Sequence, residues 1–143
     1  MYKNILLAID LGHPESWKKA LPTAVEYAQK FGCSLHLIQV VPDFGMSIVG
    51  GYFPEGYEKQ AIEDAGQKLT DFVGEHVPSA IDCHPHVAHG KAYEEILTAS
   101  KKLDVDLVVI GSHQPGTETY FLGSTASRVV RFAVCSTLVV RGS

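Results

Sequence analysis

The stretch that decides the fold of this chain is Leu107-Val-Val-Ile-Gly-Ser-His-Gln-Pro-Gly-Thr-Glu-Thr-Tyr-Phe-Leu-Gly-Ser-Thr-Ala-Ser-Arg128. Its apolar, β-branched beginning predicts a strand that ends at Gly111, and Gly123-Ser124-Thr125 opens a helical pattern. A strand, a loop and a helix in this order present backbone N–H groups and the positive end of a helix dipole to the loop. This arrangement favours an anion such as phosphate. We therefore expect the rest of the chain to position this loop and to form the other wall of a nucleotide pocket.

Length and composition limit the class of protein. The 143 residues are the size of a single domain, 1–143, and 45% hydrophobic with 20% charged residues is typical of a globular protein. A net charge of −4 argues against a nucleic-acid partner. No apolar run approaches the ~20 residues of a membrane span. The absence of a signal-like N-terminus and three widely spaced cysteines, Cys33, Cys83 and Cys135, indicate a cytoplasmic protein with buried, inert thiols.

Strand-like and helix-like patterns alternate along the whole chain. Strands are expected at residues 3–10, 34–41, 81–87, 107–110 and 136–140, and helices at 17–31, 62–73, 92–103 and 126–133. The alternation predicts an α/β fold: an open, mostly parallel five-stranded sheet with helices on both faces. The continuous apolar run at 107–110 suggests a central strand, whereas Pro85 suits an edge strand. Ser16 is a candidate N-cap for the first helix, and Pro22 suggests a kink or a later start.

A ligand in such a sheet binds beyond the carboxyl ends of the strands, where the strand order reverses. The residues expected at these ends are Asp10, Val40, Val41, Gly90, Gly111, Ser112 and His113. Backbone amides and the hydroxyls of Ser112, Ser124 and Thr125 can take phosphate oxygens. Asp10 can accept from a ribose hydroxyl or help to hold Mg²⁺, and it can equally be a strand-end cap. The backbone at Val40 and Val41 can meet the edge of an adenine base.

These segments together resemble the universal stress protein family, in its single-domain, nucleotide-binding type, over nearly the whole chain. Residues 5–10 resemble the family's first strand and its aspartate, residues 89–96 its glycine turn, and residues 133–140 its closing strand. The family's signature is Gly, two residues, Gly, nine residues, Gly, then Ser or Thr. Gly111-Ser112-His113 resembles its start and Gly123-Ser124 its end. Gln114 stands in place of the second glycine, and the loop is one residue shorter than the pattern.

The resemblance implies a Rossmann-like fold of the adenine nucleotide alpha hydrolase type. It further implies ATP, ADP or AMP as the ligand, Mg²⁺ with the phosphates, a role in stress response or signalling, and a homodimer through the C-terminal strand, residues 137–141. The nucleotide-binding residues expected on this basis are Ala8, Asp10, Val40, Val41, Gly90, Ile110, Gly111, Ser112, His113, Gln114, Gly123, Ser124 and Thr125.

Several alternatives stay open. No P-loop lysine is present, so efficient catalysis is not expected, although slow ATP hydrolysis is one option. Another is a nucleotide-free dimeric interaction protein, in which Gln114 marks a decayed site. His113 either contacts phosphate or ties the loop backbone together.

Two further features have no assigned role. His84 and His86 share one face of a strand beside Cys83, but two histidines are too few for a structural zinc site, so no metal site is expected. The apolar, glycine-rich loop at 42–54 is expected either to cover the pocket or to pack on a partner.

Overall fold

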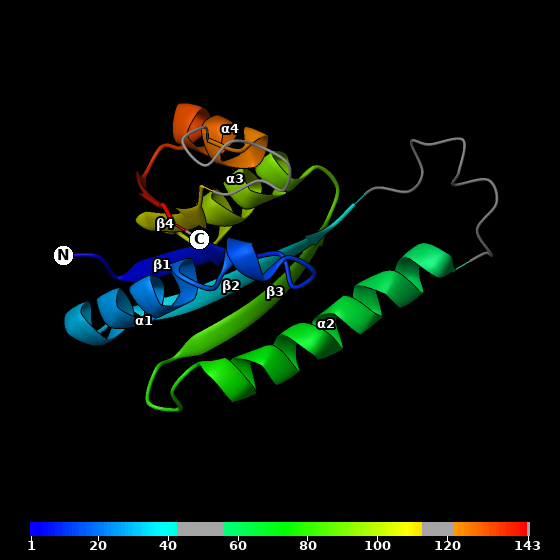
Figure 1. The fold of residues 1–143 in the computed structure, drawn as a ribbon, viewed down its shortest axis with the longest axis horizontal. Helices are drawn as coiled ribbons and strands as arrows, with labels where there is room; N and C mark the ends of the chain where they lie inside the picture. Colours follow the sequence, from blue (N-terminus) through cyan, green and yellow to red (C-terminus); the bar gives the residue numbers. More distant parts are fainter. Residues whose placement is uncertain (43–55, 113–121, 143) are drawn as a thin grey trace.

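The computed structural model describes residues 1–42, 56–112 and 122–142. In these ranges, five strands alternate with four α-helices and one 3₁₀ turn, and Figure 1 shows their arrangement. In chain order they are β1 (Asn4–Ala8), η1 (Pro14–Ser16), α1 (Ala20–Phe31), β2 (Ser34–Val41), α2 (Tyr57–His76), β3 (Cys83–His89), α3 (Ala92–Lys102), β4 (Leu107–Gly111), α4 (Ser124–Phe132) and β5 (Ser136–Val140). The strands β2 and β5 have the bounds that the sequence predicts.

The five strands form one sheet in the order β3-β2-β1-β4-β5, and every neighbouring pair is parallel. The predicted α/β class is confirmed. The strand with Pro85 lies at an edge, as expected, because an outward-facing position does not need the N–H that proline lacks. The expected central place of residues 107–110 is only approximate, since β1 is the middle strand and β4 is its neighbour.

Helices cover both faces of the sheet, with α1 and α2 on one side and α3 and α4 on the other (Figure 1). Side chains alternate between these two cores along each strand. Thus Leu7 and Leu35 pack with α1 and α2, whereas Leu6 and Ile38 pack with α3 and α4. Residues 5–7 and 108–109 are fully buried, because β1 and β4 lie inside the sheet and are covered on both faces.

The entry to the first helix differs from the sequence-based expectation. Ser16 is not the N-cap of α1; it ends η1, and α1 begins at Ala20 after Lys19. Pro22 therefore falls in the first turn, where its missing N–H breaks no helical hydrogen bond. The later start considered for Pro22 is what the structure has. The hydroxyl of Ser16 is used instead to hold the end of β1.

The strand order reverses between β1 and β4, which lie side by side with Ala8 opposite Ile110. The chain leaves β1 toward η1 and α1 on one face, and it leaves β4 toward α4 on the other. Such divergence opens a crevice at the carboxyl ends of the two strands. This crevice is the place where the candidate site is found.

Candidate functional site

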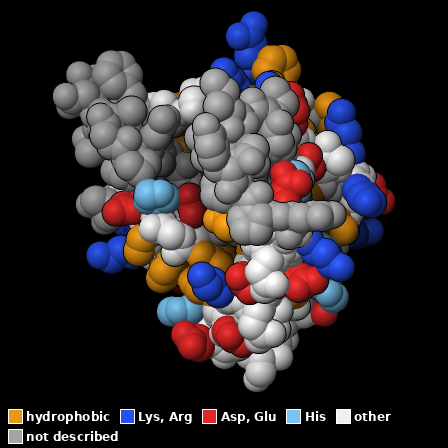
Figure 2. Space-filling view, turned by 90° about the vertical axis from the view of Figure 1, so that its right-hand side faces the viewer, with side chains coloured by type: hydrophobic (Ala, Val, Ile, Leu, Met, Phe, Trp, Pro, Cys, Tyr) orange, Lys and Arg blue, Asp and Glu red, His pale blue; other side chains and the backbone are white. Residues whose placement is uncertain are grey.

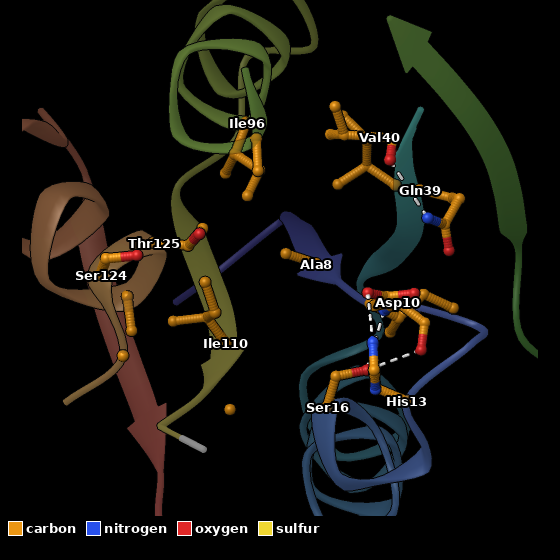
Figure 3. Close-up of a pocket in the computed structure, with 16 residues that line it drawn as sticks. Ala8, Asp10, His13, Ser16, Gln39, Val40, Ile96, Ile110, Ser124 and Thr125 are labelled. Carbon is orange, nitrogen blue, oxygen red and sulfur yellow. Dashed lines mark hydrogen bonds and ion pairs between the residues drawn. The ribbon is translucent and has the colours of Figure 1, made fainter. Parts of the chain in front are cut away.

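A pocket of about 300 Å³ opens at the carboxyl ends of β1, β2 and β4, against the N-terminus of α4 (Figure 3). The described residues that line it are Ala8, Ile9, Asp10, His13, Ser16, Ile38, Gln39, Val40, Ala92, Ile96, Ile110, Gly111, Gly123, Ser124, Thr125 and Ala126. They come from distant parts of the chain and meet only because the sheet places these strand ends together. The volume is within the range of small-molecule sites.

The first turn of α4 forms one wall of the pocket. Gly123 is the N-cap, with φ −62° and ψ 157°, and no described side chain caps the helix. Its own N–H donates to the carbonyl of Ser112 at 3.0 Å, which joins the two ends of the 113–121 segment. The first-turn residues 124–126 line the pocket. The N-terminal turn of a helix has N–H groups without intrahelical acceptors, so this wall suits an anionic group.

The turn after β1 forms the opposite wall and is held by Asp10 and Ser16 (Figure 3). The Asp10 N–H donates to Ser16 Oγ at 2.8 Å, and the Ser16 hydroxyl donates back to the Asp10 carbonyl at 3.0 Å. The Asp10 carboxylate accepts the Gly12 N–H at 3.0 Å through Oδ1, and its Oδ2 lies 3.8 Å from His13 Nε2. The carboxylate is thus oriented by its own turn while half of its side chain stays exposed.

The third wall comes from the end of β2. The Leu11 N–H donates to Gln39 Oε1 at 2.8 Å, which ties the turn after β1 to β2. Gln39 Nε2 donates to the carbonyl of Val40 at 3.2 Å. The Val40 side chain lies on the same side of the sheet as Ile38, facing the apolar residues of α3. The pocket therefore combines an apolar floor with a polar rim, as ligand sites commonly do.

The charge at the pocket is small. Among the described lining residues, Asp10 and His13 are the titratable ones, and there is no lysine or arginine. On the face of the molecule shown in Figure 2, Lys and Arg are interspersed with Asp and Glu rather than gathered. A phosphate here would have to be met by backbone N–H groups and hydroxyls. Such donors can hold an anion, but they do not supply the cation of a P-loop site.

Most of the expected nucleotide-binding residues meet in this pocket. Those that line it are Ala8, Asp10, Val40, Ile110, Gly111, Gly123, Ser124 and Thr125. The expected residues His113 and Gln114 and nearly all of the 42–54 loop lie outside the described residues.

Three expected residues do not line the pocket. The side chain of Val41 is buried, and its carbonyl accepts the N–H of Gly90 at 3.0 Å. Gly90 has φ +143°, and a Cβ there would come within 2.7 Å of Glu95 Oε1, so its glycine serves a turn. Ser112 is buried, and its N–H donates to the carbonyl of Val140 at 2.9 Å. The backbone groups of these residues thus connect neighbouring strand ends at the same edge of the sheet.

The sequence analysis missed several lining residues: Ile9, His13, Ser16, Ile38, Gln39, Ala92, Ile96 and Ala126. Two carried a usable signal. Gln39 is a polar residue inside an apolar strand end, and His13 follows Asp10 in a short turn. The others are apolar or small residues whose patterns predict only that they are buried.

Histidines and cysteines also occur outside the pocket. His84 and His86 do share a face, but His36 joins them from β2. Within the described residues, no group of three or more His, Cys, Asp or Glu side chains could hold a metal ion. Burial raises the pKa of Cys83 to about 11 and also raises the pKa of Cys33 and Cys135. None of the three forms a disulfide.

Comparisons with known proteins agree with this fold. The model of the "Universal stress protein family" matches residues 1–141. Universal stress protein G of Salmonella typhimurium is 33% identical over 143 residues, covering 99% of this chain and 100% of that protein. Universal stress protein UspA from Lactobacillus plantarum superposes with a TM-score of 0.72 at 26% identity, covering 98% of each chain. A universal stress protein from Archaeoglobus fulgidus in complex with dAMP has a TM-score of 0.70 at 19% identity, covering 98% of each chain.

Proposed function

This chain belongs to the universal stress protein family, and we propose that it binds an adenine nucleotide in the pocket between β1, β2, β4 and α4. The observation that carries the proposal is the meeting of Asp10, Val40, Gly111 and the α4 N-terminus around one cavity at the point where the strand order reverses. The dAMP bound to the relative from Archaeoglobus fulgidus supports the class of ligand.

The geometry suggests how the parts of a nucleotide would be held. The phosphates would lie at the first turn of α4, where Ser124 and Thr125 add hydroxyl donors. The base would lie against Val40, and the carboxylate of Asp10 would accept from a ribose hydroxyl or help to hold Mg²⁺. Among the other expected residues, Ala8 and Ile110 would form the floor. Val41, Gly90 and Ser112 would act indirectly, because their backbone groups hold the neighbouring strand ends. His113 and Gln114 are proposed phosphate-loop residues.

The nucleotide is proposed to be ATP, ADP or AMP, and the protein to be a cytoplasmic stress-response or signalling module. Efficient catalysis is not expected, because no cation lies among the described lining residues. No α-helix in the described ranges is long and apolar enough to cross a membrane. The three cysteines are free thiols, which suits a reducing compartment.

Co-purification tests the proposal directly. Protein purified without added nucleotide and extracted with acid should release ATP, ADP or AMP, identified by mass. Protein stripped of ligand should show a rise in melting temperature at millimolar Mg-ATP, since a ligand that binds the folded state stabilises it. An empty protein with no such rise would favour the nucleotide-free alternative. Phosphate release faster than that of buffer would favour the slow hydrolase.

We further propose a homodimer through residues 137–141. β5 lies at an edge of the sheet, and an exposed edge strand tends to pair with another chain. Phe132 and Val134, just before this strand, are 53% and 79% exposed. The variant Val134→Asp should shift the protein toward the monomer in sedimentation, whereas Tyr57→Asp, at an exposed hydrophobic position of α2, serves as the control. A monomeric wild-type protein at micromolar concentration would contradict the proposal.

A further inference from the structure

Three histidines from two neighbouring strands lie together on one face of the sheet, away from the pocket. In the register of β2 and β3, His36 pairs with His84, and Ile38 pairs with His86. Since alternate residues of a strand share a face, the three imidazoles project from the same side. We call His36, His84 and His86 the histidine cluster. His36 lies 48 residues before His84 and 50 residues before His86 in the chain, so it is the pairing of β2 with β3 that brings the three together.

The His36 ring contacts the other two rings. His36 Nδ1 and His86 Nε2 are 2.8 Å apart and share a hydrogen bond. The rings of His36 and His84 are stacked, with centroids 5.1 Å apart and planes 24° apart. The hydrogen bond requires a lone pair on one nitrogen and a proton on the other. It is therefore compatible with a neutral pair or a singly protonated pair, and not with two imidazolium rings.

The charged groups around the cluster are few. His84 Nε2 lies 3.0 Å from Asp82 Oδ1, and the Ser34 hydroxyl donates to the other oxygen of that carboxylate at 2.9 Å. The neighbour of His36 on β1 is Leu6, which is apolar. From α2, on the opposite face, Glu58 meets His89, and from α3 the Glu95 carboxylate lies beside Gly90. Asp82 is thus the carboxylate that contacts the cluster, and it holds His84 rather than the hydrogen-bonded pair.

The surroundings favour the neutral form of that pair. Burial lowers the pKa of His36, and the nearby His86 and His84 lower it further, while Asp82 opposes the shift. Burial also lowers the pKa of His86, with a smaller contribution from His84. An unperturbed histidine titrates near pH 6.5, so the unfolded chain takes up protons there before the folded one does. The stabilisation is present above that pH and is lost as the pH falls below it toward the lowered folded values.

We propose that the histidine cluster is a proton-sensitive latch that holds the edge strand β3 to β2. By holding β3 in place, the latch keeps the β2 wall of the pocket ordered. The coupling follows from register, because the β2 residues 38–40, which line the pocket, pair with residues 86–88 of β3. A second proton on the His36–His86 pair removes the acceptor of their hydrogen bond and places two positive charges side by side. β3, paired on one side only, is the element that can move away.

Amide hydrogen exchange of the full chain, corrected for intrinsic rates, tests the latch without any nucleotide. Between pH 7.5 and 5.5, protection of residues 83–89 and 38–40 should fall relative to residues 107–111 of β4. The fall is at most about tenfold for each of the two rings, because pH 5.5 is about one unit below the ordinary histidine pKa of about 6.5. The double variant His36→Asn, His86→Gln replaces the two hydrogen-bonded imidazole rings with uncharged amide side chains. Protection in this variant should not depend on pH. His76→Gln, on α2 across the sheet, is the control and should keep the wild-type pH dependence.

A measurement on the wild-type protein keeps the proposal testable if the double variant does not fold. Side-chain NMR should show His36 and His86 titrating below pH 6.5, and the cross-strand contacts of β3 weakening over the same range. Titration at or above pH 6.5, or a loss of protection spread evenly over β3 and β4, would overturn the latch. So would a double variant with the same pH dependence as the wild type.

Discussion

The neighbouring interior strands β1 and β4 and the edge strand β3 belong to one sheet but differ in burial and in composition. β1 and β4 are apolar and almost fully buried, and their carboxyl ends open the pocket. β3 carries Pro85 and two histidines of the histidine cluster, and most of its residues are only partly buried. A strand covered on both faces fixes the positions of the groups at its end, whereas a half-covered strand responds to its surroundings. The sheet thus joins interior strands that are buried on both faces to an edge strand that is only partly buried.

The largest expected effect is loss of packing under the site. Leu7→Ala should lower the free energy of unfolding by about 3 kcal/mol, because Leu7 is fully buried in β1 and its truncation leaves a cavity. Val87→Ala on β3 should lower it by about 1 kcal/mol, because this side chain is already partly exposed. Urea denaturation measures both. Equal losses would remove the contrast between interior and edge.

The next effect concerns the buried face of the edge strand. Cys83 packs toward α2, and burial raises its pKa to about 11. Since the thiolate is the nucleophile and a free cysteine has a pKa near 8.5, alkylation by iodoacetamide at pH 8 should be roughly a hundredfold slower than in urea-unfolded protein. The rate should rise as the pH approaches 11. Peptide mass spectrometry would measure the labelling of Cys83. Equal rates in the folded and unfolded forms would show that the α2-facing side of β3 is accessible to solvent.

A smaller effect is expected at the site itself. Gly123→Val should weaken adenine nucleotide binding at least about tenfold, because the new side chain enters the pocket at the helix N-terminus. The fold should persist, since φ −62° is allowed for valine. The matched control is Gly74→Val on α2, where a Cβ meets nothing within 4 Å. Calorimetric titration with Mg-ATP measures the affinity. An unchanged affinity in Gly123→Val would show that the phosphates bind elsewhere.

The smallest effect should come from Pro85. Pro85→Ala should change the free energy of unfolding by less than about 0.5 kcal/mol, because a proline on an edge strand sits where the missing N–H would face water. Thermal or urea unfolding measures this change. A change in the free energy of unfolding of more than about 1 kcal/mol would mean that the outer edge of β3 is covered in solution. The contrast between this edge strand and the interior strands would then be smaller.

The sequence predicts the bounds of some strands better than those of others. The apolar pattern predicts the bounds of β2 and β5 correctly, because those strands are distinguished by a run of side chains that must be buried. The pattern extends the first strand to Asp10, whereas β1 ends at Ala8. The reason is the pair of hydrogen bonds between Asp10 and Ser16, which turns the chain. The local sequence pattern favours Ser16 as a helix cap, whereas in the structure its hydroxyl is hydrogen-bonded to the backbone of Asp10.

The sequence by itself determined the α/β alternation, the parallel sheet, the edge position of the strand with Pro85 and the helix N-terminus at Gly123. These properties depend on periodicity and on the backbone limits of glycine and proline, which are local. The tertiary structure decided which strand ends share the pocket, that Gln39 and His13 line it, and that His36 meets His84 and His86. Such contacts depend on strand order and register, which are set by the packing of the whole chain.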